Sequence, residues 1–172
     1  MNKQTGSTFI KLIIVTVIMI VLASVAVNYG KNIMKEVEIQ DLRTNMLYIQ
    51  AQARKGLEEV CFQTVNMDES KQEDLDKINE IKQKNLYGIV LSNIPTEIQN
   101  KVQNITGIIL DETYYYLDEK ALNEMGIKDI QLEENEYFIV KYNFENANVE
   151  VINTKGYEGN YTLTQLNQLI GE

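Results

Sequence analysis

Histidine and tryptophan are absent from this 172-residue sequence, and proline and cysteine occur once each. Without histidine, the chain cannot form the Ser-His or Cys-His pairs of nucleophilic enzymes, a zinc site with imidazole ligands or an imidazole proton relay. With Cys61 alone, no disulfide can form within the chain, so the fold must be stabilised by its core. We expect Cys61 itself to be a small buried apolar residue rather than a reactive thiol.

Negative charge is confined to the later part of the chain. All 25 acidic residues lie after Val27, and from residue 31 onward they are opposed by 14 basic residues, which leaves a net charge of −11. Such a surface repels nucleic acid and anionic lipid headgroups, so we expect no nucleic-acid partner. The sequence also offers no nucleophile beside a base, no cluster of metal ligands and no phosphate-binding loop, and it therefore predicts neither an enzyme nor a cofactor.

One long apolar run extends from Leu12 to Val27 and contains no charge, proline or glycine. As a helix it would be roughly 24 Å long, or roughly 33 Å with residues 8–10 and 28–29, against about 30 Å of hydrocarbon in a bilayer. Lys11 lies near one end, where its ammonium group can reach the headgroups. A buried helix of a soluble protein is the alternative, but no other part of the chain is apolar enough to surround this segment. We therefore predict that this helix enters a membrane.

A short polar leader, Met1–Gly6, precedes the hexapeptide Ser7-Thr-Phe-Ile-Lys-Leu12 and the apolar run. This order resembles the N-terminus of type IV pilins and type II secretion pseudopilins, in which glycine is followed by Phe-Thr-Leu-Ile-Glu-Leu and an apolar helix. The residues that match the pattern are Thr8, Phe9, Ile10 and Leu12. Three features differ: Ser7 replaces the first phenylalanine, Lys11 replaces the glutamate, and the apolar helix lacks proline and glycine.

The resemblance implies a division of the chain into three parts. Residues 1–6 would be a prepilin-type leader, cleaved between Gly6 and Ser7 by a prepilin peptidase. Residues 7–30 would be the transmembrane and assembly helix, beginning with Thr8, Phe9, Ile10, Lys11 and Leu12. Residues 31–172 would be an acidic α+β domain outside the cytoplasm that includes the amphipathic half of the long helix.

The same resemblance implies a function and a location. The chain would be a structural subunit of a type IV pilus-like filament or of a secretion or competence pseudopilus, and a minor or specialised one because of Lys11. Its partners would be other pilin-like subunits, in homo- or hetero-assembly, together with the peptidase and the membrane. It would cross the cytoplasmic (inner) membrane once, with its C-terminal domain outside, and it would reach the cell surface when assembled.

Beyond the apolar run, apolar residues recur every three or four positions, which is one face of an amphipathic helix. They are Ile39, Leu42, Met46, Ile49, Ala53, Leu57 and Val60. We predict one helix of about 50 residues that joins this stretch to the membrane segment and ends near Gln63. Two helices separated by a loop at residues 28–31 are the alternative.

The remainder predicts short elements of both kinds. Helices are expected over residues 75–85, from Pro95 through Val102, over 118–126 with Asp118 as the cap, and after a capping Thr164. Strands are expected over 114–117, 136–142, 149–153 and 161–163, with turns at 143–148 and 155–160. The type of residues 86–91 is left open. The predicted fold is therefore α+β and pilin-like: the long helix packs on an antiparallel sheet of three or four strands with short helices.

Three groups of residues invite a binding role, and a plainer explanation is favoured for each. The Tyr114–Tyr116 cluster could be a carbohydrate or partner platform, but packing of two of the three rings in the sheet is the simpler account. The carboxylates of Glu133–Glu136 could hold calcium, although loop carboxylates are usually just solvated. Those of Asp68–Asp76 lack the glycine and the spacing of an EF-hand loop.

A different class of function remains open from the same N-terminus. In a secreted or anchored binding protein, Lys11 would close the basic region of an ordinary signal peptide, and Leu12–Leu22 would be its apolar region. Ser24-Val-Ala26 would then fit a signal-peptidase site. An anchored enzyme is a third class, and no motif in the sequence supports it.

Overall fold

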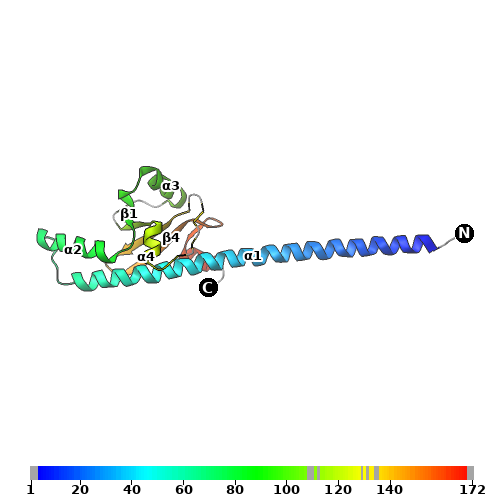
Figure 1. Ribbon diagram of the computed structural model, residues 1–172, viewed down its shortest axis with the longest axis horizontal. Coiled ribbons are helices and arrows are strands. Elements are labelled where there is room, and N and C mark those ends of the chain that lie inside the picture. The colour runs from blue at the N-terminus through cyan, green and yellow to red at the C-terminus, as the bar shows by residue number, and fades with distance from the viewer. Residues whose placement is uncertain are drawn as a thin grey trace. The chain divides into compact units, whose positions relative to one another are not determined.

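Figure 1 shows the computed structural model of the chain, which describes residues 4–107, 111, 113–128, 130, 132–133 and 136–169. Up to residue 32, side chains are described only at Met19. The chain divides into two units, Met1–Asp41 and Leu42–Glu172. Helix α1 (Gln4–Thr64) makes up the described part of the first unit and contributes its last turns to the second. Its backbone is helical through residues 28–31, where a loop was the alternative.

The second unit is an α+β fold around a five-stranded antiparallel sheet in the order β1-β2-β3-β4-β5. The strands are β1 (Ile89–Val90), β2 (Tyr114–Leu117), β3 (Phe138–Asn143), β4 (Asn148–Tyr157) and β5 (Asn160–Thr162). The sheet has one strand more than the upper prediction, because the undecided stretch at residues 86–91 supplies β1. The turn predicted over 155–160 is shorter, since β4 continues through a register shift to Tyr157.

One face of the sheet is covered by α1, as its apolar spacing predicts. The residues of the predicted stripe from Met46 to Val60 are all buried, whereas Ile39 and Leu42 are half-buried. The buried residues from Met46 to Val60 form one cluster with alternate residues of β3, namely Phe138, Val140 and Tyr142, and Leu42 packs against it. Alternation along a strand sends Ile139 to the opposite face.

The opposite face of the sheet carries a second, smaller core that the sequence did not reveal. Helix α3 (Thr96–Thr106) and the 3₁₀ turn η1 (Leu91–Asn93) supply Val102 and Leu91 to it. Ile139 of β3 and Ile152 of β4 complete it from the sheet. In Figure 1, α3 and α1 accordingly lie on opposite sides of the strands. The sheet is thus buried on both faces.

The short helices begin and end at residues that satisfy their terminal backbone groups. The Asp118 carboxylate accepts a hydrogen bond from the Ala121 N–H at 2.8 Å, which caps α4 (Glu119–Glu124) as predicted. Helix α3 ends at Gly107, whose left-handed backbone lets its N–H bond to the Gln103 carbonyl. Helix α2 (Gln72–Asn85) begins three residues before the predicted start.

The cap predicted for the last helix, Thr164, is wrong. Helix α5 (Leu163–Leu169) is capped by Thr162, whose Oγ1 accepts a hydrogen bond from the Gln165 N–H at 3.3 Å. The Gln165 Oε1 accepts hydrogen bonds from the N–H groups of Tyr161 and Thr162. Thr162 and Gln165 therefore form a capping box, a pattern whose partners are three residues apart.

The two ends of the second unit meet. Leu163 and Leu166 of α5 enter the same cluster as Met46 of α1. Beside them, the Arg43 Nε donates a hydrogen bond to the Asn167 Oδ1 at 2.7 Å, across 124 positions of sequence. The first and last described elements of this unit therefore share one core.

Two leucines of α1 test this arrangement because one is buried and the other is not. Leu57 is fully buried in the cluster, whereas Leu47 is 42% exposed. Leu57→Ala should lower the free energy of unfolding by about 2–5 kcal/mol, since it leaves a cavity in the core. Leu47→Ala should change it by less than about 0.5 kcal/mol, as surface substitutions do. Urea unfolding followed by circular dichroism measures both, and equal effects would contradict the burial of this face.

Candidate functional site

The predicted processing and assembly residues fall within the backbone range of α1. Their side chains, those of Ser7, Thr8, Phe9, Ile10, Lys11 and Leu12, lie outside the described part of the chain, as does the environment of Gly6. Across the residues that the structure does describe, no helix has the length and apolar character needed to span a bilayer. Apart from Met19, the side chains of the predicted span 7–30 lie outside those described.

The carboxylates considered for calcium are bound by donors of the protein itself. The Glu136 carboxylate accepts hydrogen bonds from the Asn153 Nδ2 at 2.8 Å and from the Glu133 N–H at 3.0 Å. The Glu133 carboxylate in turn lies 3.0 Å from the Lys155 Nζ. At the other position, Asp68 accepts bonds from the N–H and hydroxyl of Ser70. Within the described ranges, no three acidic or cysteine side chains converge as a metal site would require.

Asn153 joins the Glu133–Glu136 loop to β4, and sequence reasoning missed it. It is fully buried, and its Oδ1 accepts a hydrogen bond from the Gly156 N–H at 2.9 Å. Next to it, the Tyr137 N–H donates to the Thr154 Oγ1 at 2.8 Å, and the Thr154 N–H donates to the Tyr137 carbonyl at 3.0 Å. Asn153 and Thr154 thus lie where the register of β4 shifts against β5, and their side chains accept hydrogen bonds from backbone N–H groups there. No sequence pattern distinguishes this asparagine from those in surface turns.

The tyrosine cluster of β2 is largely occupied by packing. Tyr114 is buried in the smaller core, and Tyr116 packs against it with its ring 5.6 Å from that of Tyr137. Tyr115 points to the other face, where its ring meets that of Tyr142 edge-on at 4.9 Å. Packing in the sheet is confirmed, and it includes all three rings where two were predicted. None of them forms an open aromatic platform by itself.

The pKa shifts that occur in this unit do not create an acid–base pair. Burial raises the pKa of Tyr142, whose hydroxyl bonds to the backbone of Tyr87, and burial also raises the pKa of Tyr116. The hydrogen bond to the Tyr114 hydroxyl raises the pKa of Lys141, and the hydrogen bond from the Thr113 hydroxyl lowers the pKa of Asp111. Each shift moves the pKa of its group further from 7, so each group keeps its usual charge at pH 7.

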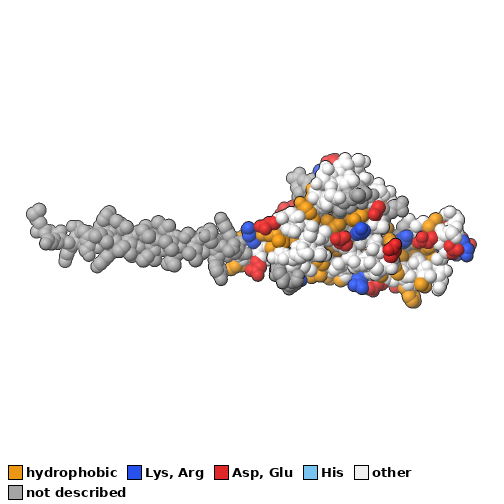
Figure 2. All heavy atoms as spheres, turned by 180° about the vertical axis from the view of Figure 1, so that it is seen from behind, with side chains coloured by type: hydrophobic (Ala, Val, Ile, Leu, Met, Phe, Trp, Pro, Cys, Tyr) orange, Lys and Arg blue, Asp and Glu red, His pale blue; other side chains and the backbone are white. Residues whose placement is uncertain are grey.

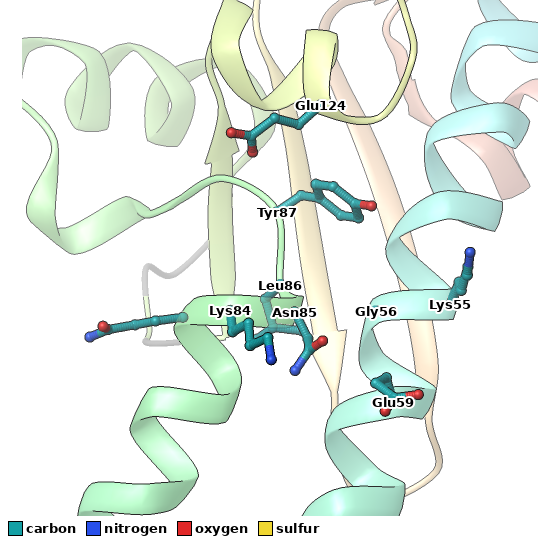
Figure 3. A pocket seen from close by; sticks show the side chains of 9 residues that line it. Lys55, Gly56, Glu59, Lys84, Asn85, Leu86, Tyr87 and Glu124 are labelled. Atoms are coloured by element: carbon teal, nitrogen blue, oxygen red, sulfur yellow. The ribbon is translucent and has the colours of Figure 1, made fainter.

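A pocket of about 230 Å³ lies between the ends of α1, α2 and α4 (Figure 3). It occurs where α2 ends against α1: a Cβ atom added at Gly56 would be 2.2 Å from the Asn85 carbonyl oxygen. Charges of both signs surround it, among them Lys55 and Glu59 of α1 and Glu124 of α4. They show no nucleophile beside a base, so the pocket is explained as space beside a close helix crossing.

Exposed apolar side chains are a further feature of α1. Within the second unit, Tyr48 is 45% exposed and Phe62 is 79% exposed. They are separated by fourteen positions, close to four helical turns, so both lie on the same side of α1. The Tyr48 ring lines a pocket with Gly126 and Ile127, whereas Phe62 is the more exposed of the two. Elsewhere on this unit, Figure 2 shows acidic and basic side chains interspersed. The described surface therefore offers apolar contact along a helix rather than a charged site.

The role of Asn153 can be tested by removing its amide. Asn153→Ala should lower the free energy of unfolding by about 1–3 kcal/mol, because it leaves the Gly156 N–H buried without a partner. Asn123→Ala, an exposed asparagine of α4, is the matched control and should change it by less than about 0.5 kcal/mol. Thermal or urea unfolding measures the difference. Equal stabilities for the two variants would mean that the Asn153 bonds contribute nothing net.

Comparison with known proteins found no match of this chain to a protein-family model, to a curated protein or to a solved structure.

Proposed function

We propose that this chain is a pilin-like structural subunit of a type IV pilus-like filament or of a secretion or competence pseudopilus. In this proposal it is processed after Gly6, held in the cytoplasmic membrane by residues 7–30, and assembled through its N-terminal helix. The acidic domain then lies outside the cytoplasm. It is a minor or specialised subunit rather than the bulk component.

The observation that carries the proposal is the continuity between the N-terminal motif and the packed domain. The motif from Gly6 to Leu12 and the buried stripe from Met46 to Val60 belong to one helix, α1. A helix that is apolar at one end and amphipathic at the other supports a subunit anchored by the first part and folded around the second. An ordinary signal peptide needs no such continuity, because its helix is removed.

The outer side of α1 and the chemistry of the domain give further support. Exposed apolar residues such as Phe62 on a helix whose other side is buried suit contact with neighbouring subunits. The acid–base and metal-ligand groups that an enzyme needs do not come together in the described part of the unit. A structural role requires neither acid–base groups nor metal ligands.

Processing is the first test. Gly6→Val should leave the leader attached, because a bulky side chain at the cleaved bond hinders the peptidase, whereas Thr5→Val in the leader should still be processed. Intact-mass analysis of protein made beside a prepilin peptidase distinguishes a chain beginning at Met1 from one beginning at Ser7. If Gly6→Val is still cut before Ser7, the cleavage site is wrong. A mature chain beginning at Val27 would instead indicate a signal peptide and a secreted binding protein.

The second test concerns the positive charge of Lys11. The pilin resemblance implies that a carboxylate at this place neutralises the N-terminal amine of a neighbouring subunit in the apolar core of the filament. With Lys11, that amine meets a like charge, and two unit charges about 4 Å apart repel by roughly 4 kcal/mol even at an effective dielectric constant near 20. We therefore expect few filaments when this chain is the only subunit present.

Electron microscopy of sheared surface fractions measures that outcome. Lys11→Glu should increase homopolymer filaments, because it turns the repulsion into attraction. Lys31→Glu makes the same charge change beyond the apolar run and should not increase them. Abundant filaments of the unaltered chain alone would contradict the assignment to a minor subunit, and co-assembly with a partner that supplies a carboxylate would support it.

A further inference from the structure

A groove of about 600 Å³ lies between α2 and the β1 edge of the sheet. Its lining comes from α2, from β1 and η1, and from residues at the β2 and β3 ends. Ligand sites in proteins commonly measure about 300–1,000 Å³, so this groove has room for a small molecule of a few linked rings. It is separate from the predicted assembly residues of α1, and nothing in its chemistry depends on the proposed function.

One wall of the groove is a pair of amides on α2. Asn79 and Gln83 are four positions apart, so their side chains lie on the same side of the helix. In the part of the chain that the structure describes, neither amide bonds to another protein group. Each offers a donor and an acceptor at once. This wall can therefore bind a ligand whose groups also do both.

The other side of the groove is also polar, and its base is aromatic. Ser92 and Asn93 of η1 face the groove with Thr113, which precedes β2. Tyr115 and Phe144 supply the rings, both of them partly buried against the larger core. The edge-on contact of Tyr115 with Tyr142 holds its ring in place. Amides and hydroxyls around ring surfaces match a ligand with polar rims and apolar C–H faces.

The charged side chains of the lining limit the class of ligand that the groove can bind. The whole chain has a net charge of −9, yet no carboxylate is among the described residues that line this groove. Among them Lys82 is the one charged side chain, and its Nζ lies 4.6 Å from the centre of the Phe144 ring. A cation over an aromatic face is already partly stabilised, and one lysine does not make a polyanion site. The groove therefore suits an uncharged ligand.

We infer that this groove binds a neutral oligosaccharide. Hydroxyl groups of sugars both donate and accept hydrogen bonds, as the two polar walls require, and the C–H face of a sugar ring can lie on Tyr115, whereas the Phe144 ring is covered by Lys82. An extended peptide would bind chiefly by main-chain bonds to a strand edge. Here that edge is β1, which has only two residues, Ile89 and Val90. The side chains of the groove offer more bonds than its edge does.

The test uses the full chain in a detergent without a sugar headgroup, because a maltoside would compete. Maltotriose, cellotriose and chitotriose are titrated in turn by isothermal calorimetry and by saturation-transfer NMR. We expect at least one of them to bind with a Kd of about 1 mM or tighter. The double variant Asn79→Ala/Gln83→Ala should weaken that binding by about tenfold or more, since it removes the polar wall of α2.

The matched control is Asn100→Ala/Gln103→Ala, which removes two exposed amides from α3. It should leave the affinity unchanged, and both double variants should keep the circular dichroism melting curve of the parent. The inference is overturned if none of the three sugars binds. It is also overturned if a sugar binds equally well to both double variants.

Discussion

The apolar face of α1 between Met46 and Val60 is covered by the sheet, and the rest of the second unit is arranged around this contact. A single cysteine excludes an internal disulfide, so buried apolar surface has to stabilise the domain. Helix α4 adds Leu122 to this cluster and α5 adds Leu166, although each helix has fewer than eight residues. Helices that short are not stable alone, and their docking in the common core explains why they form.

Charged side chains contribute little to this stability despite their number. Pairs such as Arg54–Glu58, Lys77–Glu73 and Lys120–Glu124 are helical neighbours exposed to water. Exposed pairs of this kind are worth a few tenths of a kcal/mol, so their main effect is to keep the surface soluble. Against this charged surface, a groove whose described lining has no carboxylate and a helix side with exposed Phe62 are the places where other molecules have most to gain from contact.

Sequence patterns predicted the elements that depend on residues close together in the chain. The three- and four-residue spacing on α1 and the Asp118 cap each depend on neighbours in sequence, and each is confirmed. Strand β1 could not be predicted, because two residues carry no periodicity and its pairing with β2 comes from 25 positions away or more. The smaller core was missed for a similar reason: α3 is too short for its buried side to be assigned to a particular face of the sheet.

The candidate binding features also divide into those that follow from the sequence and those that only the fold assembles. Packing of the β2 tyrosines followed from composition, whereas the Asn153 bonds arise only when β4 shifts its register beside the Glu133–Glu136 loop. The groove likewise joins Asn79, Asn93 and Phe144, which are brought together by the sheet and not by any motif. Sequence reasoning identifies a site when its residues form a pattern, and it fails when the fold alone assembles them.

The two ends of the second unit are in contact, and the Arg43–Asn167 hydrogen bond joins them. This contact has a consequence for how the protein is made. Synthesis proceeds from the N-terminus, so the stripe on α1 emerges from the ribosome long before Leu163 and Leu166 exist to cover it. A chain stopped before α5 has an incomplete core. The domain therefore completes its folding only after α5 has been synthesised, and until then the apolar side of α1 is open to chaperones, to proteases and to premature contact with other chains.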